Sequence, residues 1–306
     1  MSDLSCRDVR SVLGRGRGRH RRVALNGLSF TVESGEVVGI VGMAGSGKTT
    51  LLRILGGDCL PSQGIVTLDG IPLVLAATRR QIGYVPDPPL VPPELRGIEW
   101  LAYLAAHHEP RPGERSRLVS GVVELSGLGA AAARRAAGYD RGEMLRLAIA
   151  GAALTGRRLV VLDETLTGCD PVLGHDLRRV ARSLAERGRI VVIASRDVGA
   201  LERVATRAIV LSRGRVVADV SMATLVQERV AELALNGGGL SAIGDLLLCF
   251  RGAVRTGEGL AVPLVRGRTL ESVLSACRVR RVAVSGSRVR FRTLEDILVV
   301  AARQDR

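Results

Sequence analysis

A glycine-rich segment of eight residues constrains the fold of this chain more than any other feature. Residues 42–49 read Gly-Met-Ala-Gly-Ser-Gly-Lys-Thr and match the pattern G-x-x-x-x-G-K-[ST] in full. The segment follows an apolar strand pattern at Glu36–Val41 and opens an apolar helix pattern from Thr49. In such a loop the backbone N–H groups point at phosphate, and the helix N-terminus adds a favourable dipole. The pattern predicts a strand, loop and helix that bind the phosphates of a nucleotide.

The polar residues of this loop have expected roles. Lys48 would hold the β- and γ-phosphates, and the Thr49 hydroxyl would ligate Mg²⁺. Lys48 is the only lysine among 44 basic residues, and the other 43 are arginines. A bias that replaced every other lysine kept the one that the mechanism requires. We therefore expect the nucleotide to be bound by Gly42, Met43, Ala44, Gly45, Ser46, Gly47, Lys48, Thr49 and Thr50.

The net charge of +14 gives weaker guidance about partners. An arginine-for-lysine bias this strong is typical of a GC-rich genome, and this weakens the inference of nucleic-acid binding from a basic chain. Some attraction to anionic lipid head groups would still follow. We expect no specific nucleic-acid partner, although the run Arg15–Arg22 keeps that alternative open.

A second segment supplies two acids. The apolar run Leu159–Leu162 ends in Asp163 and Glu164, 115 residues after Lys48. An Asp at the end of such a strand suits a Mg²⁺ site, because it binds the ion through a water molecule. Glu164 suits a general base that polarises the attacking water. Together with the phosphate loop, this pattern predicts nucleotide hydrolysis.

The length and the pattern predict two domains. The chain has 306 residues, is 46% hydrophobic, and contains no apolar run of the about 18 residues that a membrane-spanning helix needs. Short apolar runs alternate with helical patterns, which favours an α/β fold with a mostly parallel sheet. We expect a nucleotide-binding domain at 1–222, with a helical subdomain at about 88–138. Residues 223–306 read as strand, helix, strand, helix, strand, helix, and predict a small α+β domain.

The motifs together resemble the nucleotide-binding domain of ABC transporters over the first 220 residues or so. The segment Arg80–Asp87 is similar to the Q-loop region of that family, and Thr167–Asp170 is similar to its D-loop. Tyr139–Glu143 lies where the family has its Leu-Ser-Gly-Gly-Gln signature, ending 20 residues before Asp163. Ala194–Asp197 stands where the family has its switch histidine. The tail Arg290–Ile297 is similar to the C-terminal motif of drug exporters of the daunorubicin-resistance type.

Several positions depart from the family pattern. Asp87 replaces the Q-loop glutamine and would still ligate Mg²⁺, beside Thr49 and Asp163. Arg196 replaces the switch histidine. In the signature only Gly142 is kept, because Asp140 and Arg141 replace a serine and a glycine. Two further departures concern the adenine site and the residue after the catalytic acid. Leu13 stands in place of the stacking aromatic, with His20 as a possible substitute, and Thr165 replaces a proline.

The resemblance implies a function and its partners. A P-loop ABC cassette, which has a mostly parallel sheet with antiparallel β and helical subdomains, would bind ATP and Mg²⁺ in the cytoplasm, at the inner face of the membrane. It would pair as a homodimer or heterodimer with another ATPase subunit and drive a separate integral-membrane permease, as an exporter does. The signature residues Asp140, Arg141 and Gly142 would contact ATP on the opposite subunit, with Glu164 and Arg196 as catalytic residues. Hydrolysis would be weak or partner-dependent.

Three alternatives stay open at this point. In the first alternative, the chain binds ATP but never hydrolyses it, because the elements that complete hydrolysis are altered. A non-transport ABC protein acting on ribosomes or nucleic acid usually carries two cassettes in one chain, whereas this chain has one. A P-loop kinase is disfavoured by the 115 residues and the helical insert between the two nucleotide motifs.

Overall fold

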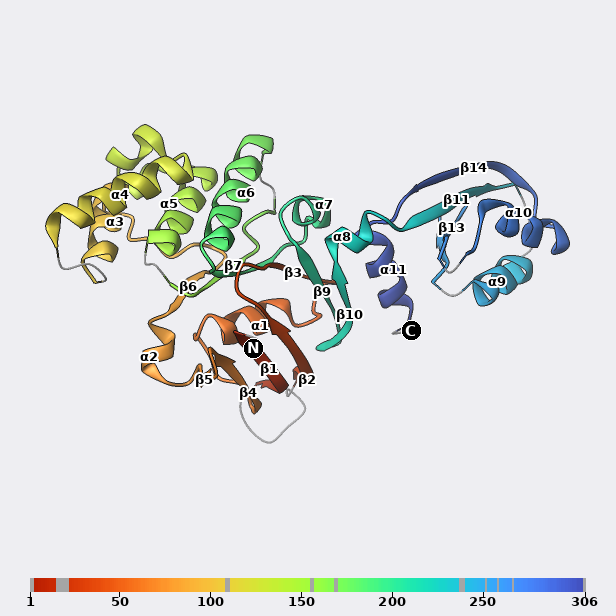
Figure 1. The fold of residues 1–306 in the computed structure, drawn as a ribbon, viewed down its shortest axis with the longest axis horizontal. Coiled ribbons are helices and arrows are strands. Elements are labelled where there is room, and N and C mark those ends of the chain that lie inside the picture. Colours follow the sequence, from red (N-terminus) through yellow and green to blue (C-terminus); the bar gives the residue numbers. More distant parts are fainter. Residues whose placement is uncertain are drawn as a thin grey trace. The chain divides into compact units, whose positions relative to one another are not determined.

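The computed structural model describes residues 3–14, 22–107, 111–154, 157–167, 170–236, 240–250, 252–257, 259–265 and 267–304. The chain divides into two compact units, Met1–Asp219 and Val220–Arg306 (Figure 1). Most of the Arg15–Arg22 run, including His20, lies outside the described residues, as do Gly168 and Cys169. Among the helices that the structure describes, none combines the length and the hydropathy that a bilayer crossing requires.

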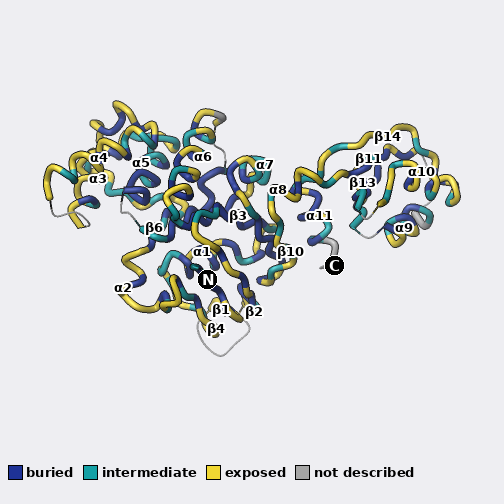
Figure 2. Tube along the Cα trace, in the orientation of Figure 1, coloured by how far each residue is buried: buried dark blue, intermediate teal, exposed yellow. Residues whose placement is uncertain are grey.

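The first unit is built on a six-stranded sheet with the order β10-β9-β3-β8-β7-β6. Four of its pairings, β9 with β3, β3 with β8, β8 with β7 and β7 with β6, are parallel. All residues of β7 and β8 are buried, as expected for parallel strands covered on both faces. Figure 2 shows this buried centre in dark blue around β3. The strands are β3 Val37–Gly42, β6 Ile82–Val85, β7 Leu159–Asp163, β8 Ile190–Ala194, β9 Arg207–Ser212 and β10 Arg215–Ser221.

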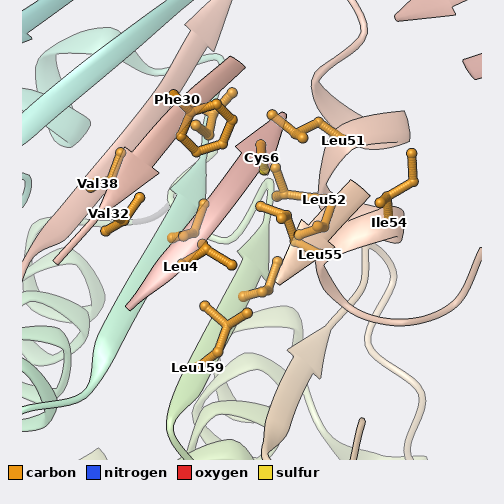
Figure 3. Packing of buried hydrophobic residues seen from close by; sticks show 14 of the residues in the cluster. Leu4, Cys6, Phe30, Val32, Val38, Leu51, Leu52, Ile54, Leu55 and Leu159 are labelled. Atoms are coloured by element: carbon orange, nitrogen blue, oxygen red, sulfur yellow. The ribbon is translucent and has the colours of Figure 1, made fainter. Parts of the chain in front are cut away.

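A second, antiparallel sheet packs against helix α1 (Lys48–Leu55). Its order is β2-β1-β4-β5, with β1 Leu4–Leu13, β2 Arg22–Val32, β4 Gln63–Leu68 and β5 Ile71–Pro72. Leu51, Leu52 and Leu55 of α1 lie in one apolar cluster with Leu4 of β1 and Leu159 of β7 (Figure 3). Burying three leucine side chains contributes about 1.5–3 kcal/mol each before entropy is counted. This packing fixes the helix that begins at Lys48.

Helices form the rest of the first unit. In the stretch that the sequence predicts to be helical, the chain forms α3 (Gly97–Ala106), α4 (Pro112–Ser126) and two short 3₁₀ helices. The helix α5 (Arg141–Leu154) packs against both α3 and α4. The remaining helices are α2 Ala76–Arg79, α6 Pro171–Glu186 and α7 Val198–Glu202.

The second unit has an antiparallel sheet with the order β12-β13-β11-β14. The expected alternation of strands and helices is present, but the structure adds the helix α8 and a short strand, β12. The strand β12 forms a hairpin with β13. Apolar residues of β11, β13, α9 and α10 form its main core. The elements are α8 Met222–Leu225, β11 Arg229–Leu235, α9 Leu240–Cys249, β12 Val254–Thr256, β13 Gly259–Pro263, α10 Leu270–Val279, β14 Val284–Phe291 and α11 Leu294–Gln304.

One buried hydroxyl gives a test of the packing in the first unit. Thr78 of α2 is buried, and its Oγ1 has no hydrogen-bond partner within the described part of the chain. We expect Thr78→Val to raise the free energy of unfolding by about 1 kcal/mol, because the variant removes a buried polar atom without a lost bond. Urea unfolding measures this change.

The matched control is Thr206→Val, because the Thr206 hydroxyl accepts a bond from Val37 N and donates one to Val37 O, both at 3.1 Å. That variant should lose about 1–2 kcal/mol. A loss in both variants would show that the Thr78 hydroxyl is bonded.

Candidate functional site

The predicted phosphate loop lies between the end of β3 and the start of α1. Gly47 has a φ of 105°, a conformation that favours glycine. A Cβ on Gly42 would lie 2.4 Å from both the Leu211 carbonyl oxygen and Ser46 Oγ, so no larger residue fits there. The ammonium of Lys48 lies inside the loop, and its Nζ donates to the carbonyl oxygens of Gly42 at 2.7 Å and Met43 at 3.2 Å. The loop is therefore closed around its lysine.

The surroundings of Lys48 combine burial with negative charge. Lys48 is buried, and this burial lowers the pKa of its ammonium. The carboxylates of Glu164 and Asp163 oppose that shift, while Arg196 adds to it. The cation is thus partly stripped of water and faces two acids, an arrangement suited to exchanging its two carbonyl contacts for phosphate oxygens.

Asp163 lies at the carboxyl end of β7 with one oxygen free. The residue is only 3% exposed, and its Oδ1 has no hydrogen-bond partner in the described structure. Burial, followed by the charges of Glu164 and Asp87, raises the pKa of Asp163 to about 6. Asp163 also lines a cavity of about 500 Å³ together with Thr49 and Asp87.

The three predicted Mg²⁺ ligands are therefore brought together at one cavity. Carboxylate and hydroxyl oxygens are the hard donors that Mg²⁺ prefers, usually alongside nucleotide phosphates and water. The orphaned oxygen of Asp163 fits that ion. No group of three or more His, Cys, Asp or Glu side chains that could hold a metal occurs among the described residues.

Replacing Asp163 with Asn tests this carboxylate through its pH dependence. Its pKa is about 6 in the folded chain against 3.8 ordinarily, so the native state holds the proton more tightly than the unfolded state does. Asp163 therefore costs no stability where both states are protonated, and lowers stability as the pH rises from about 4 to about 6. Without nucleotide or Mg²⁺, Asp163→Asn should exceed the unmodified chain in unfolding free energy by about 3 kcal/mol at pH 7 and by less than about 1 kcal/mol at pH 4.

Urea unfolding at the two pH values in EDTA measures this difference. An equal gain at both pH values would contradict the raised pKa.

Glu164 follows directly and is held by three contacts. Its backbone has a φ of 49°, which is uncommon for a residue other than glycine. Its Oε2 accepts a bond from Thr167 Oγ1 at 2.7 Å and one from Arg196 N at 3.1 Å. Its Oε1 lies 3.4 Å from Arg196 Nε. The two predicted catalytic residues, Glu164 and Arg196, are thus in contact. The sequence places Thr167 in the D-loop-like segment and Ser195 in the switch segment, but it did not reveal that Thr167 bonds to Glu164 or that Ser195 bonds to Thr167.

The altered signature segment begins α5 and has a local structural role. Asp140 accepts a bond from Glu143 N at 2.8 Å, and Glu143 Oε2 accepts one from Asp140 N at 3.2 Å. This reciprocal pair is a capping box, which satisfies N–H groups at the helix start. Arg134, rather than Arg141, forms an ion pair with this segment, through Glu143. Asp140 and Arg141 line a cavity of about 450 Å³ that Asp163 and Glu164 also line.

The predicted adenine contact lies at the end of the β1–β2 hairpin. Leu13 is 45% exposed and pairs with Arg22 across the two strands. Arg22 Nη2 donates to the carbonyl oxygen of Gly45 in the phosphate loop at 3.1 Å. The hairpin end is therefore tied to the loop by an arginine, a contact that the sequence pattern did not reveal.

Comparisons with known proteins agree with this arrangement. The family model described as ABC transporter matches residues 25–167. An ABC transporter ATP-binding protein of Synechocystis sp. is 31% identical over 227 residues, which cover 73% of this chain and 64%, less than two thirds, of that protein. The Nod factor export ATP-binding protein I of Rhizobium sp. (strain N33) is 31% identical over 211 residues, which cover 68% of this chain and 69% of that protein.

Solved structures show the same fold. A dimeric bacterial ABC transporter cassette superposes with a TM-score of 0.66 at 25% identity, covering 72% of this chain and 98% of that one. An ATP-binding cassette in a post-hydrolysis state with ADP and Pi gives the same score and coverage at 24% identity. These likenesses confirm the P-loop ABC cassette fold expected from the sequence. With the family model, the relatives and the fold in agreement, the chain belongs to the ABC transporter family of ATP-binding proteins.

Proposed function

We propose that this chain is the ATP-binding, energy-coupling subunit of an ABC transporter. The observation that carries the proposal is the phosphate loop closed around one buried lysine, together with the Asp163 oxygen that has no hydrogen-bond partner in the described part of the chain. ATP would bind along residues 42–50, where the inward N–H groups and the start of α1 meet its phosphates. Lys48 would release the Gly42 and Met43 carbonyl oxygens and bind the β- and γ-phosphates.

Hydrolysis would follow from the acids at the end of β7. Thr49, Asp87 and Asp163 would hold Mg²⁺, which when bound neutralises charge on the phosphates. Glu164 would accept a proton from the attacking water. Arg196, whose side chain is 75% exposed, would bind the γ-phosphate as a permanently charged cation.

The altered signature would act across a dimer. In a homodimer, or a heterodimer with another ATPase subunit, Asp140, Arg141 and Gly142 would contact the ATP held by the partner. Asp140 brings negative charge toward that phosphate, although its carboxylate is already engaged by Glu143 N. Arg141 would supply the compensating cation. Hydrolysis by this chain alone would therefore be slow, and an intact signature on a partner would accelerate it.

A separate integral-membrane permease would be driven by the binding and hydrolysis of ATP. The cavity that holds Thr49, Asp87 and Asp163 also reaches Trp100 and the exposed Leu90, so nucleotide binding and the 88–138 region share one space. The relatives named Nod factor export proteins support export, and the Arg290–Ile297 tail supports the daunorubicin-resistance type. The chain would lie in the cytoplasm, at the inner face of the membrane.

Membrane fractionation tests this assignment. In the cell that makes it, the chain should sediment with membranes, be released by alkaline wash, and copurify with an integral-membrane protein after mild detergent. Recovery with ribosomes or nucleic acid, and release by raised salt, would instead support the alternative of a non-transport ABC protein.

A further inference from the structure

A chain of hydroxyl groups lies behind the carboxylate of Glu164. Thr167 Oγ1 is 2.7 Å from Glu164 Oε2 and 3.3 Å from the Oγ of Ser195. Ser195 is buried, and its Oγ accepts a bond from Asp197 N at 3.0 Å. Glu164 and Thr167 follow β7, and Ser195 follows β8, the neighbouring parallel strand. Because both strands end at the same edge of the sheet, the hydroxyls of Thr167 and Ser195, 28 positions apart, meet next to the Glu164 carboxylate.

The hydrogen bonds that link these hydroxyl groups run in one direction. An ionised carboxylate only accepts, so the Thr167 hydroxyl donates its single hydrogen to Glu164. The Ser195 hydroxyl must then donate to Thr167, and Ser195 accepts from Asp197 N. Each donor polarises the next, which strengthens the bond to the carboxylate.

This arrangement leaves the two oxygens of Glu164 unequal. Oε2 accepts from both Thr167 Oγ1 and Arg196 N, whereas Oε1 faces only the guanidinium of Arg196 among the contacts that the structure records for it. The Arg196 side chain is largely exposed, and if it turned from Glu164 to an arriving γ-phosphate it would uncover Oε1. The strained φ of 49° at Glu164 adds a need for side-chain anchors, since such a conformation persists only where its surroundings hold it.

We infer that Thr167, backed by Ser195, is a positioning residue that fixes Glu164 with Oε1 toward the attacking water. The inference rests on the proposed function. In the step, Oε1 takes one proton from water, and the water oxygen forms a bond to the γ-phosphorus. The bond from that phosphorus to the β–γ bridging oxygen breaks, and its electron pair leaves on ADP. Thr167 touches neither ATP nor water in this account and acts only through Glu164.

The test is single-turnover hydrolysis of γ-labelled ATP by the full chain with Mg²⁺. Thr167→Val keeps the shape and removes the hydroxyl, so the rate constant should fall about 10- to 100-fold while nucleotide affinity stays within about twofold. Thr167→Ser keeps the donor and should lie within about threefold of the unmodified rate. Thr78→Val is the matched control, since it makes the same change at a buried hydroxyl that has no hydrogen-bond partner among the described residues, and it should leave the rate unchanged.

A double-mutant cycle separates positioning from a merely structural role. In a Glu164→Gln background, Thr167→Val should lower the rate by less than about threefold, because residues that act as a unit are not additive. Equal losses in both backgrounds, equal losses in the Ser and Val variants, or an unchanged rate in Thr167→Val would each overturn the inference alone. Absence of any hydrolysis by the unmodified chain, with ATP still bound, would overturn the inference together with the hydrolytic part of the proposed function.

Discussion

Replacing Lys48 with Ala should weaken Mg·ATP binding at least about tenfold. Lys48 is the only lysine in the chain. Its ammonium lies inside the phosphate loop and donates hydrogen bonds to the Gly42 and Met43 carbonyl oxygens. On binding, it would exchange those contacts for charged phosphate oxygens, and a hydrogen bond of that kind is worth about 1.5–3 kcal/mol. Each 1.4 kcal/mol corresponds to a factor of about ten in affinity.

A titration with a fluorescent ATP analogue measures the effect. Arg117→Ala is a suitable control, because it removes one positive charge from an exposed ion pair with Glu114 on α4. The control should bind as the unmodified chain does. Unchanged affinity in Lys48→Ala would remove residues 42–50 from the nucleotide site.

The second large effect concerns turnover. The purified chain should bind Mg·ATP but hydrolyse it very slowly, and Asp140→Ser, Arg141→Gly and Arg196→His together should raise the rate. Restoring one donor to a transition state typically changes a rate by about 10²–10³. The substitutions suit the structure, because serine also caps a helix start and so preserves the capping role of Asp140. Arg196→His also removes the ion pair that occupies Glu164 Oε1.

Steady-state phosphate release by the two proteins, at matched concentration, measures this effect. Glu164→Gln in the same triple background is the control, and it should return the rate to a low value. Brisk turnover by the unmodified chain, lost in the triple variant, would show that Asp140, Arg141 and Arg196 are an alternative catalytic solution.

Sequence patterns predicted the elements that carry strong local signals. The parallel strands read as short β-branched runs, and the phosphate loop has a motif whose strand and helix context is visible in the chain. The β12–β13 hairpin was missed because β12 spans only Val254–Thr256, too short for a periodic pattern. The capping box at Asp140 and Glu143 has a detectable acid-x-x-acid pattern, but the family resemblance implied a phosphate contact for Asp140 instead.

Contacts between distant residues set the limit of sequence reasoning at the site. The bond between Thr167 and Glu164 is local, but its support by Ser195 and Arg196 depends on β7 and β8 lying side by side in a particular register. No spacing rule predicts that register from one sequence. The link from Arg22 to Gly45 likewise depends on the hairpin end reaching the loop.

The most direct measurement of the central claim is a crystal structure of the chain with Mg²⁺ and a non-hydrolysable ATP analogue. We expect the analogue's phosphates along residues 42–50, with Lys48 Nζ moved from the Gly42 and Met43 carbonyl oxygens to the β- and γ-phosphates. The ion should lie between Thr49 and Asp163. An analogue bound elsewhere, or one bound in the loop while Lys48 keeps both carbonyl contacts, would contradict the account.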